Sequence, residues 1–152
     1  MTESLEIVRA LDDVFVNHAP AMIPAESNSK DRQRVAYLLE LEKELQSAWF
    51  SFVFYPVEGD AFVKARTNFL YALIRVDDAL GSTSGPWFLG GMSPSIVDVQ
   101  YISHVERIVA YVLYWKGVEI RNTGNSHCWR NGWTHLRIGF RIWQQSRIIT
   151  PW

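Results

Sequence analysis

The chain has 152 residues, of which 48% are hydrophobic and 20% are charged, and its formal net charge is −1. This length fits one globular unit that buries about two-thirds of its unfolded surface, and the composition excludes a wholly disordered or fibrous chain. The longest nearly apolar run, residues 48–57, is about half as long as a membrane helix needs. A single Cys excludes an internal disulfide and a Cys-based zinc site. We therefore expect a globular cytoplasmic protein that does not bind a membrane or a metal ion.

The net charge conceals an uneven distribution along the chain. All sixteen acidic residues lie at or before Glu119, together with ten of the fifteen basic residues. Beyond residue 120 there are five Arg, no Lys and no acid, and four of the seven Trp also fall there. This abrupt change indicates that residues 122–152 form an atypical basic, Trp-rich tail.

The first expected helix covers residues 4–15. Apolar residues such as Val8 and Leu11 recur there at helical spacing, and Ser4 is a suitable N-cap. Residues 17–30 follow as a polar segment with two Pro, which predicts a loop. Its length favours a joint between two units over a turn within one.

Two further helices are expected, one from Asp31 to just before Pro56 and one from about Asp60 to Leu80. Both show apolar residues at three- and four-residue steps with charged residues between them. The apolar positions of the first are Val35, Leu38, Leu39, Leu45, Ala48, Trp49 and Phe52. Those of the second are Phe62, Ala65, Phe69, Ala72, Leu73 and Val76.

The fourth expected helix has the clearest start signal in the chain. Ser95 and Asp98 fit a structural N-capping box, in which each side chain accepts from the other residue's backbone N–H. The helix should run to about Tyr114, before Gly117, and its many apolar residues predict that it lies at the centre of a bundle. No strand alternation competes with these four helices before residue 120, so the sequence predicts an all-α fold.

The segment WFLGGMSPSIVD, from Trp87 to Asp98, resembles the F-L/F-G-G-x-S-x-x-D signature of the glutathione transferase family, in its C-terminal helical domain. Residues 102–107 (ISHVER) are similar to the P-x-x-E-R run of the omega, lambda and dehydroascorbate-reductase-like branches. The resemblance covers about residues 3–120. It implies a glutathione-transferase C-terminal-type helical bundle, in which the capping box serves folding.

Residues 3–12 (ESLEIVRALD) resemble the family's E-S-x-x-I-x-x-Y-L helix, the last helix of its thioredoxin-like glutathione-binding domain. By this resemblance Glu3 and Ser4 would bind the γ-glutamyl end of glutathione. The free N–H groups and positive dipole at a helix N-terminus favour such a carboxylate. The implied organisation is a remnant helix at 1–16, an interdomain linker at 17–30, a helical domain at 31–121 and the tail.

The resemblance implies glutathione-dependent transfer or thiol reduction in a complete parent protein, with an apolar electrophile or a disulfide as second substrate. No residue of this chain matches the family's thiol-activating residue, so we assign no catalytic residue and expect the chain to be inactive alone. The family also permits a homodimer.

The alternative to a glutathione-dependent function is a non-catalytic helical interaction module. An apolar substrate pocket could include Trp49, Phe50, Tyr101 and Trp115, although burial in the core is the commoner fate of such residues.

A one-base shift of reading frame offers an explanation for the tail. In the shifted frame, each new codon consists of the last base of one residue's codon and the first two bases of the next residue's codon. This regrouping forces Leu-Leu across residues 127–129, Asp across 133–134 and Ala across 143–144. The degenerate positions allow KFPLLEKWMDTFEDRVPYLATKSDYYT, which resembles the family's closing helix, P-x-L-x-x-W-x-x-x-F-x-x-R-P-x-Y. We hypothesise a shift, or a misassigned splice junction, near residues 122–125. A nucleotide sequence that lacks this second reading would refute it.

The remaining reactive side chains carry simpler interpretations. Cys128 beside His127 resembles a nucleophile and base, but adjacent residues rarely face each other, so we expect an incidental thiol. The four His have no metal-ligand spacing, and His104 is expected to be a packing residue. The mixture of Arg and Trp in the tail resembles a surface for single-stranded nucleic acid, but the acidic body argues against a nucleic-acid partner.

Overall fold

A computed structural model describes residues 2–15, 21–25, 27–55, 58–91, 93–118 and 120 of the chain. Within these ranges there are four helices and no strand, which confirms the predicted all-α class. The helices are α1 (Thr2–Val14), α2 (Ser29–Val53), α3 (Gly59–Gly81) and α4 (Ile96–Lys116).

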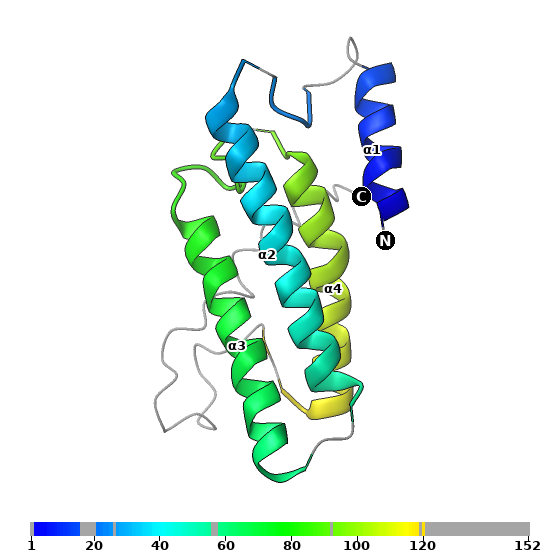
Figure 1. Cartoon of the computed structure of the whole chain (residues 1–152), viewed down its shortest axis with the longest axis vertical. Coiled ribbons are helices and arrows are strands. Elements are labelled where there is room, and N and C mark those ends of the chain that lie inside the picture. The colour runs from blue at the N-terminus through cyan, green and yellow to red at the C-terminus, as the bar shows by residue number, and fades with distance from the viewer. Residues whose placement is uncertain are drawn as a thin grey trace.

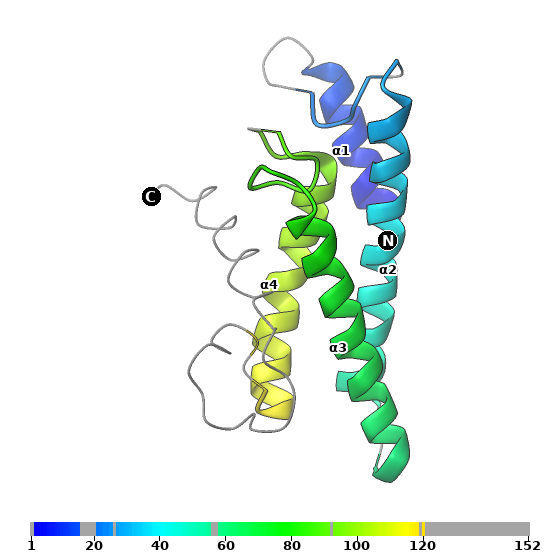
Figure 2. The ribbon, with the colours of Figure 1, turned by 90° about the vertical axis from the view of Figure 1, so that its left-hand side faces the viewer.

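The three long helices lie side by side along the length of the molecule (Figure 1). α3 runs antiparallel to α2, whereas α4 runs parallel to α2. The shorter α1 lies at the end where α2 and α4 begin, and the second view places it there too (Figure 2). None of these helices is both long and apolar enough to cross a membrane within the described part of the chain.

The helix ends differ from the predicted ones by a few residues. α1 begins at Thr2, so Ser4 lies in its first turn and the prediction of an N-cap there was wrong. α2 begins at Ser29, two residues before the predicted Asp31, because the Asn28 side chain caps it by accepting from the Asp31 backbone N–H at 3.2 Å. The bounds of α3 agree with the prediction to within one residue.

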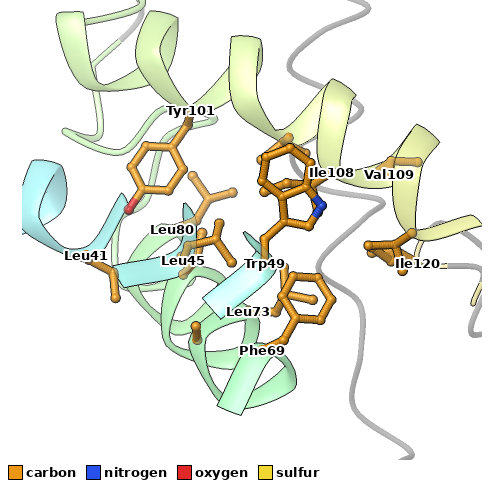
Figure 3. Close-up of a cluster of buried hydrophobic side chains, with 14 of the residues drawn as sticks. Leu41, Leu45, Trp49, Phe69, Leu73, Leu80, Tyr101, Ile108, Val109 and Ile120 are labelled. Atoms are coloured by element: carbon orange, nitrogen blue, oxygen red, sulfur yellow. The ribbon is translucent and has the colours of Figure 1, made fainter. Parts of the chain in front are cut away.

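The hydrophobic core lies between α2 and its two long neighbours, and Figure 3 shows part of it. α2 packs against both α3 and α4. Its buried face includes Leu38, Leu41, Leu45, Trp49 and Phe52, and α3 contributes Phe69, Leu70, Leu73, Val76 and Leu80. The helical period in the sequence therefore identified most of the core on these two helices.

The structure corrects the prediction that the fourth helix lies at the centre. Among the described elements the main helix contacts are those of α2 with α3 and of α2 with α4, so α2 rather than α4 is the helix common to both. α4 buries one face, but its last two turns expose several large apolar side chains: Tyr111, Leu113, Tyr114 and Trp115. Apolar content alone overestimated its burial, because a helix with apolar residues on several faces does not show from its sequence which faces have neighbours.

Candidate functional site

The predicted capping box is formed at the start of α4. Asp98 is fully buried, and one carboxylate oxygen accepts from the Ser95 backbone N–H at 2.8 Å and from its hydroxyl at 2.6 Å. The other oxygen accepts from the backbone N–H of Phe88, ten residues earlier, at 3.0 Å. Asp98 therefore caps α4 and also anchors the loop that precedes it, a second role that the sequence motif did not reveal.

Arg34 of α2 holds the same loop from its other side. Its Nε donates to the Phe88 carbonyl at 3.0 Å, and one Nη donates to the Ala79 carbonyl at 2.9 Å and to Ser82 Oγ at 2.8 Å. Ala79 lies in the last turn of α3, where a cation satisfies carbonyls that lack helical partners. Arg34 thus ties the beginning of α2 to the end of α3 and to Phe88.

Two glycines shape the loop between these anchors. Gly90 has a φ of 76° and donates its N–H to the Trp87 carbonyl at 2.9 Å. A Cβ at Gly85 would lie 2.5 Å from the Gly90 carbonyl oxygen, which no side chain can tolerate without movement of the backbone. The first Gly of the FLGG motif therefore supplies a left-handed turn, and Gly85 packs directly on it.

The four residues expected to line an apolar pocket have different environments. Trp49 is buried and its ring contacts that of Phe50, which is 41% exposed, with centroids 4.8 Å apart. Tyr101 is buried between α2 and the loop, where it contacts Phe88 at 4.4 Å between ring centroids. Trp115 is 62% exposed and contacts the neighbouring Tyr114 ring. Only Trp49 and Phe50 have an aromatic contact with each other.

A different set of rings gathers around Trp49, from the ends of α2 and α4. We call Trp49, Phe50, Phe54 and Tyr111 the aromatic cluster. Phe54 and Tyr111 lie 5.6 and 5.8 Å from the Trp49 ring, both edge-on, and 5.8 Å from each other. Trp49 Nε1 is buried and has no hydrogen-bond acceptor among the residues that the structure describes. The cluster combines a partly exposed apolar surface with one unused donor. Tyr111 and Phe54 escaped the sequence analysis because their proximity to Trp49 depends on how the helices pack.

Tyr101 has the environment of a structural residue. Its hydroxyl donates to the Leu38 carbonyl of α2 at 2.9 Å. Burial raises the pKa of Tyr101 far above its ordinary value, and the nearby Glu42 carboxylate raises it further. The Tyr101 hydroxyl therefore keeps its proton above the pH at which an exposed tyrosine ionises, and this preserves the hydrogen bond between α4 and α2.

Alkaline pH should weaken the fold through Tyr101. In the unfolded chain Tyr101 ionises near its ordinary pKa of about 10, whereas in the folded chain it stays protonated. The unfolded state therefore binds fewer protons above about pH 10, so the free energy of unfolding falls as pH rises past that value. Chemical denaturation at a series of pH values tests this. Replacing Tyr101 with Phe should flatten the fall relative to a control variant in which the exposed Tyr114 becomes Phe.

A buried acid on α2 contacts His104 on α4. Glu42 of α2 is 4% exposed, and its carboxylate contacts Nδ1 of His104 on α4. The interaction agrees with the expected packing role of His104, whereas Glu42 was not expected in the core because acids are seldom buried. A buried polar contact of this kind specifies how α2 and α4 align, because either partner alone would be left as an unpaired buried polar group.

The remaining predicted site residues lie partly or wholly outside the described part of the chain. Glu3 and Ser4 lie in the first turn of α1, with side chains outside the described atoms. Cys128, His127 and the whole tail lie outside the described residues. Among the residues that are described, no three His, Cys, Asp or Glu gather as metal ligands would. An open groove of about 440 Å³ runs between α2 and α3, beside the charged side chains of Glu40, Lys43 and Glu44.

Comparison with known proteins finds one informative similarity. The chain is 30% identical over 125 residues to "Protein IN2-1 homolog A" of Oryza sativa subsp. japonica. The match covers 80% of this chain and 46% of the rice protein, so the chain spans about half the length of the curated relative it matches. No protein-family model and no solved structure matches the chain.

Proposed function

We propose that this chain is the helical part of a glutathione-transferase-type protein whose complete form carries out glutathione-dependent transfer or thiol reduction. Its described helices would form the C-terminal-type bundle of that family. The family's signature segment, Trp87–Asp98, supports this, because Asp98 and Gly90 have the structural roles that such a motif needs. The similarity to a longer plant protein is consistent with a partial chain.

The observation that carries the proposal is the exposed apolar stripe on α1. Ile7, Leu11 and Val14 are spaced at helical intervals and are 60%, 46% and 71% exposed. Val8, on another face, packs against the core of the bundle. A helix with apolar residues on two sides suits a position between two packed units. Residues 3–12 resemble the last helix of the family's glutathione-binding domain, which precedes the interdomain linker, so such a position would suit α1.

In this proposal glutathione binds at the beginning of α1. The helix starts at Thr2, so its first N–H groups have no partner within the helix and its positive dipole end is next to Glu3 and Ser4. A γ-glutamyl carboxylate would accept from these N–H groups and the Ser4 hydroxyl, and Glu3 would pair with the ligand's ammonium group. The second substrate, an apolar electrophile or a disulfide, would contact the aromatic cluster.

A non-catalytic interaction module is the second candidate, and one observation favours it. α4 ends in a group of exposed large side chains, with Leu113 51%, Tyr114 80% and Trp115 62% exposed. Tyr and Trp are enriched where proteins bind each other. In this alternative the helical scaffold would present these residues to a protein partner, and glutathione would not bind.

Titration of the chain with reduced glutathione, followed by backbone amide NMR shifts, tests the proposal. We expect shifts at the amides of Glu3, Ser4 and Leu5, because their N–H groups would donate to the carboxylate. γ-Glutamylcysteine should reproduce these shifts, whereas cysteinylglycine, which lacks the γ-glutamyl end, should not. Replacing Ser4 with Ala should weaken the response, and replacing Ser103, which lies on α4, should not. Equal responses to both dipeptides, or no response to glutathione, would refute the proposed site.

A further inference from the structure

Asp12 occupies a position that local helix physics does not explain. It lies in the last turn of α1, where the negative end of the helix dipole disfavours a carboxylate. Both of its oxygens are used by backbone groups beyond the helix. Oδ1 accepts from the Met22 N–H at 2.8 Å, and Oδ2 accepts from the Ile23 N–H at 3.1 Å. The carboxylate thus folds the segment after α1 back onto the helix.

Met22 continues the connection to the start of α4. Its carbonyl accepts from the Ile96 N–H at 3.0 Å. Ile96 is the first residue of α4, so its N–H is one of the donors that a helix cannot satisfy internally. One residue of the connecting segment therefore links the end of α1 to the beginning of α4 through its own N–H and C=O.

Apolar contacts accompany this chain of hydrogen bonds. Met22 and Ile23 are partly buried against the core, and so is Val8 of α1. α1 has few other attachments to the three long helices among the described residues, since the main helix contacts are those of α2 with α3 and with α4. The position of α1 on the bundle therefore depends on a small number of groups, and Asp12 supplies two of the hydrogen bonds.

We propose that Asp12 is a clamp that sets the position of α1 against the N-terminus of α4, and that its release frees α1 while α2, α3 and α4 stay folded. The clamp consists of the Asp12 carboxylate, the backbone of Met22 and Ile23, and the Ile96 N–H. If glutathione binds at Glu3 and Ser4, an extension that rests on the proposed function, Asp12 is a positioning residue. It would hold that site in register with the bundle.

Amide hydrogen exchange on the full chain tests the clamp, with Asp12→Asn, Asp12→Ala and Asp13→Asn compared with the parent. Hydrogen bonds to a charged group are strong, so we expect Asp12→Ala to speed exchange at Met22 and Ile23 by about tenfold or more. Exchange at Ile96 should rise as well, because its acceptor is on the released segment. Asp12→Asn keeps one acceptor oxygen and should give an intermediate effect. Exchange at Ile108 and Val112 should not change.

Asp13 provides a matched control because it is the exposed neighbour of Asp12 and carries the same charge in the same helical turn. Removing a negative charge from this turn should stabilise α1 through the dipole, so Asp13→Asn should leave exchange at Met22 unchanged or slower. Asp12→Asn should have the opposite effect. Equal behaviour of the two variants, or unchanged exchange at Met22, Ile23 and Ile96 in Asp12→Ala, would overturn the clamp.

The glutathione titration separates this proposal from the proposed function. Faster exchange in the Asp12 variants, with no glutathione response in the parent, would support the clamp and refute the ligand site. A glutathione response in the parent with unchanged exchange in the Asp12 variants would support the ligand site and refute the clamp. If both hold, Asp12→Asn should weaken the glutathione response and Asp13→Asn should not.

Discussion

Replacing Ile108 with Ala should lower the free energy of unfolding by about 2–5 kcal/mol, because it removes buried methyl groups and leaves a cavity. Ile108 is 1% exposed and belongs to the same core cluster as Trp49, Leu45 and Leu73, shown in Figure 3. Native domains have a margin of only about 5–15 kcal/mol. The variant should therefore lose a large part of its stability, and its transition in urea, followed by circular dichroism, should move to a much lower urea concentration.

A neighbouring leucine on the same helix provides the control. Leu113 is 51% exposed, so Leu113→Ala should change the free energy of unfolding by no more than about 0.5 kcal/mol. If the two variants unfold at the same urea concentration, the assignment of the Ile108 face of α4 to the core is wrong.

Replacing Asp98 with Ala should destabilise the chain more than the loss of an ordinary cap. A lost N-cap costs about 1 kcal/mol. Asp98 also anchors the Phe88 N–H, and both this donor and the Ser95 N–H would be left buried and unpaired. The cost of the lost cap already includes the Ser95 donor, and the unpaired Phe88 donor adds about 1–3 kcal/mol, so we expect a total loss of about 2–4 kcal/mol with a folded state retained. Urea denaturation measures the loss.

The exposed Asp78 of α3 is a control for the loss of one negative charge, and Asp78→Ala should have little effect. Amide exchange distinguishes anchoring from capping. In Asp98→Ala, exchange should accelerate at Phe88 as well as at Ser95. Acceleration at Ser95 alone would show that Asp98 acts only as the cap that its sequence motif predicts.

Local sequence signals predicted most of the secondary structure. The Ser95–Asp98 box predicted the start of α4, and Gly117, with a φ of 62°, ends it as expected. Apolar spacing identified the buried face of α2 from Leu38 to Phe52. These signals act over one or two turns of a helix, so they are readable from the chain alone. The start of α2 was misplaced because a side chain at residue 28, outside the apolar pattern, caps the helix.

The groups that connect the helices were decided only by the tertiary structure. Arg34 meets Phe88 across 54 residues, and Glu42 meets His104 across 62. No local signal predicted a role for Asp12, which accepts from the Met22 N–H only because the chain folds back after α1. The candidate pocket also depended on the tertiary structure. Tyr111, which was not predicted there, lies beside Trp49, and Tyr101, which was predicted there, is buried in the core. Periodicity shows that a helix has an apolar face, but the partner of that face depends on packing between distant segments. The long-range contacts of Arg34, Glu42 and Tyr111 form only through that packing.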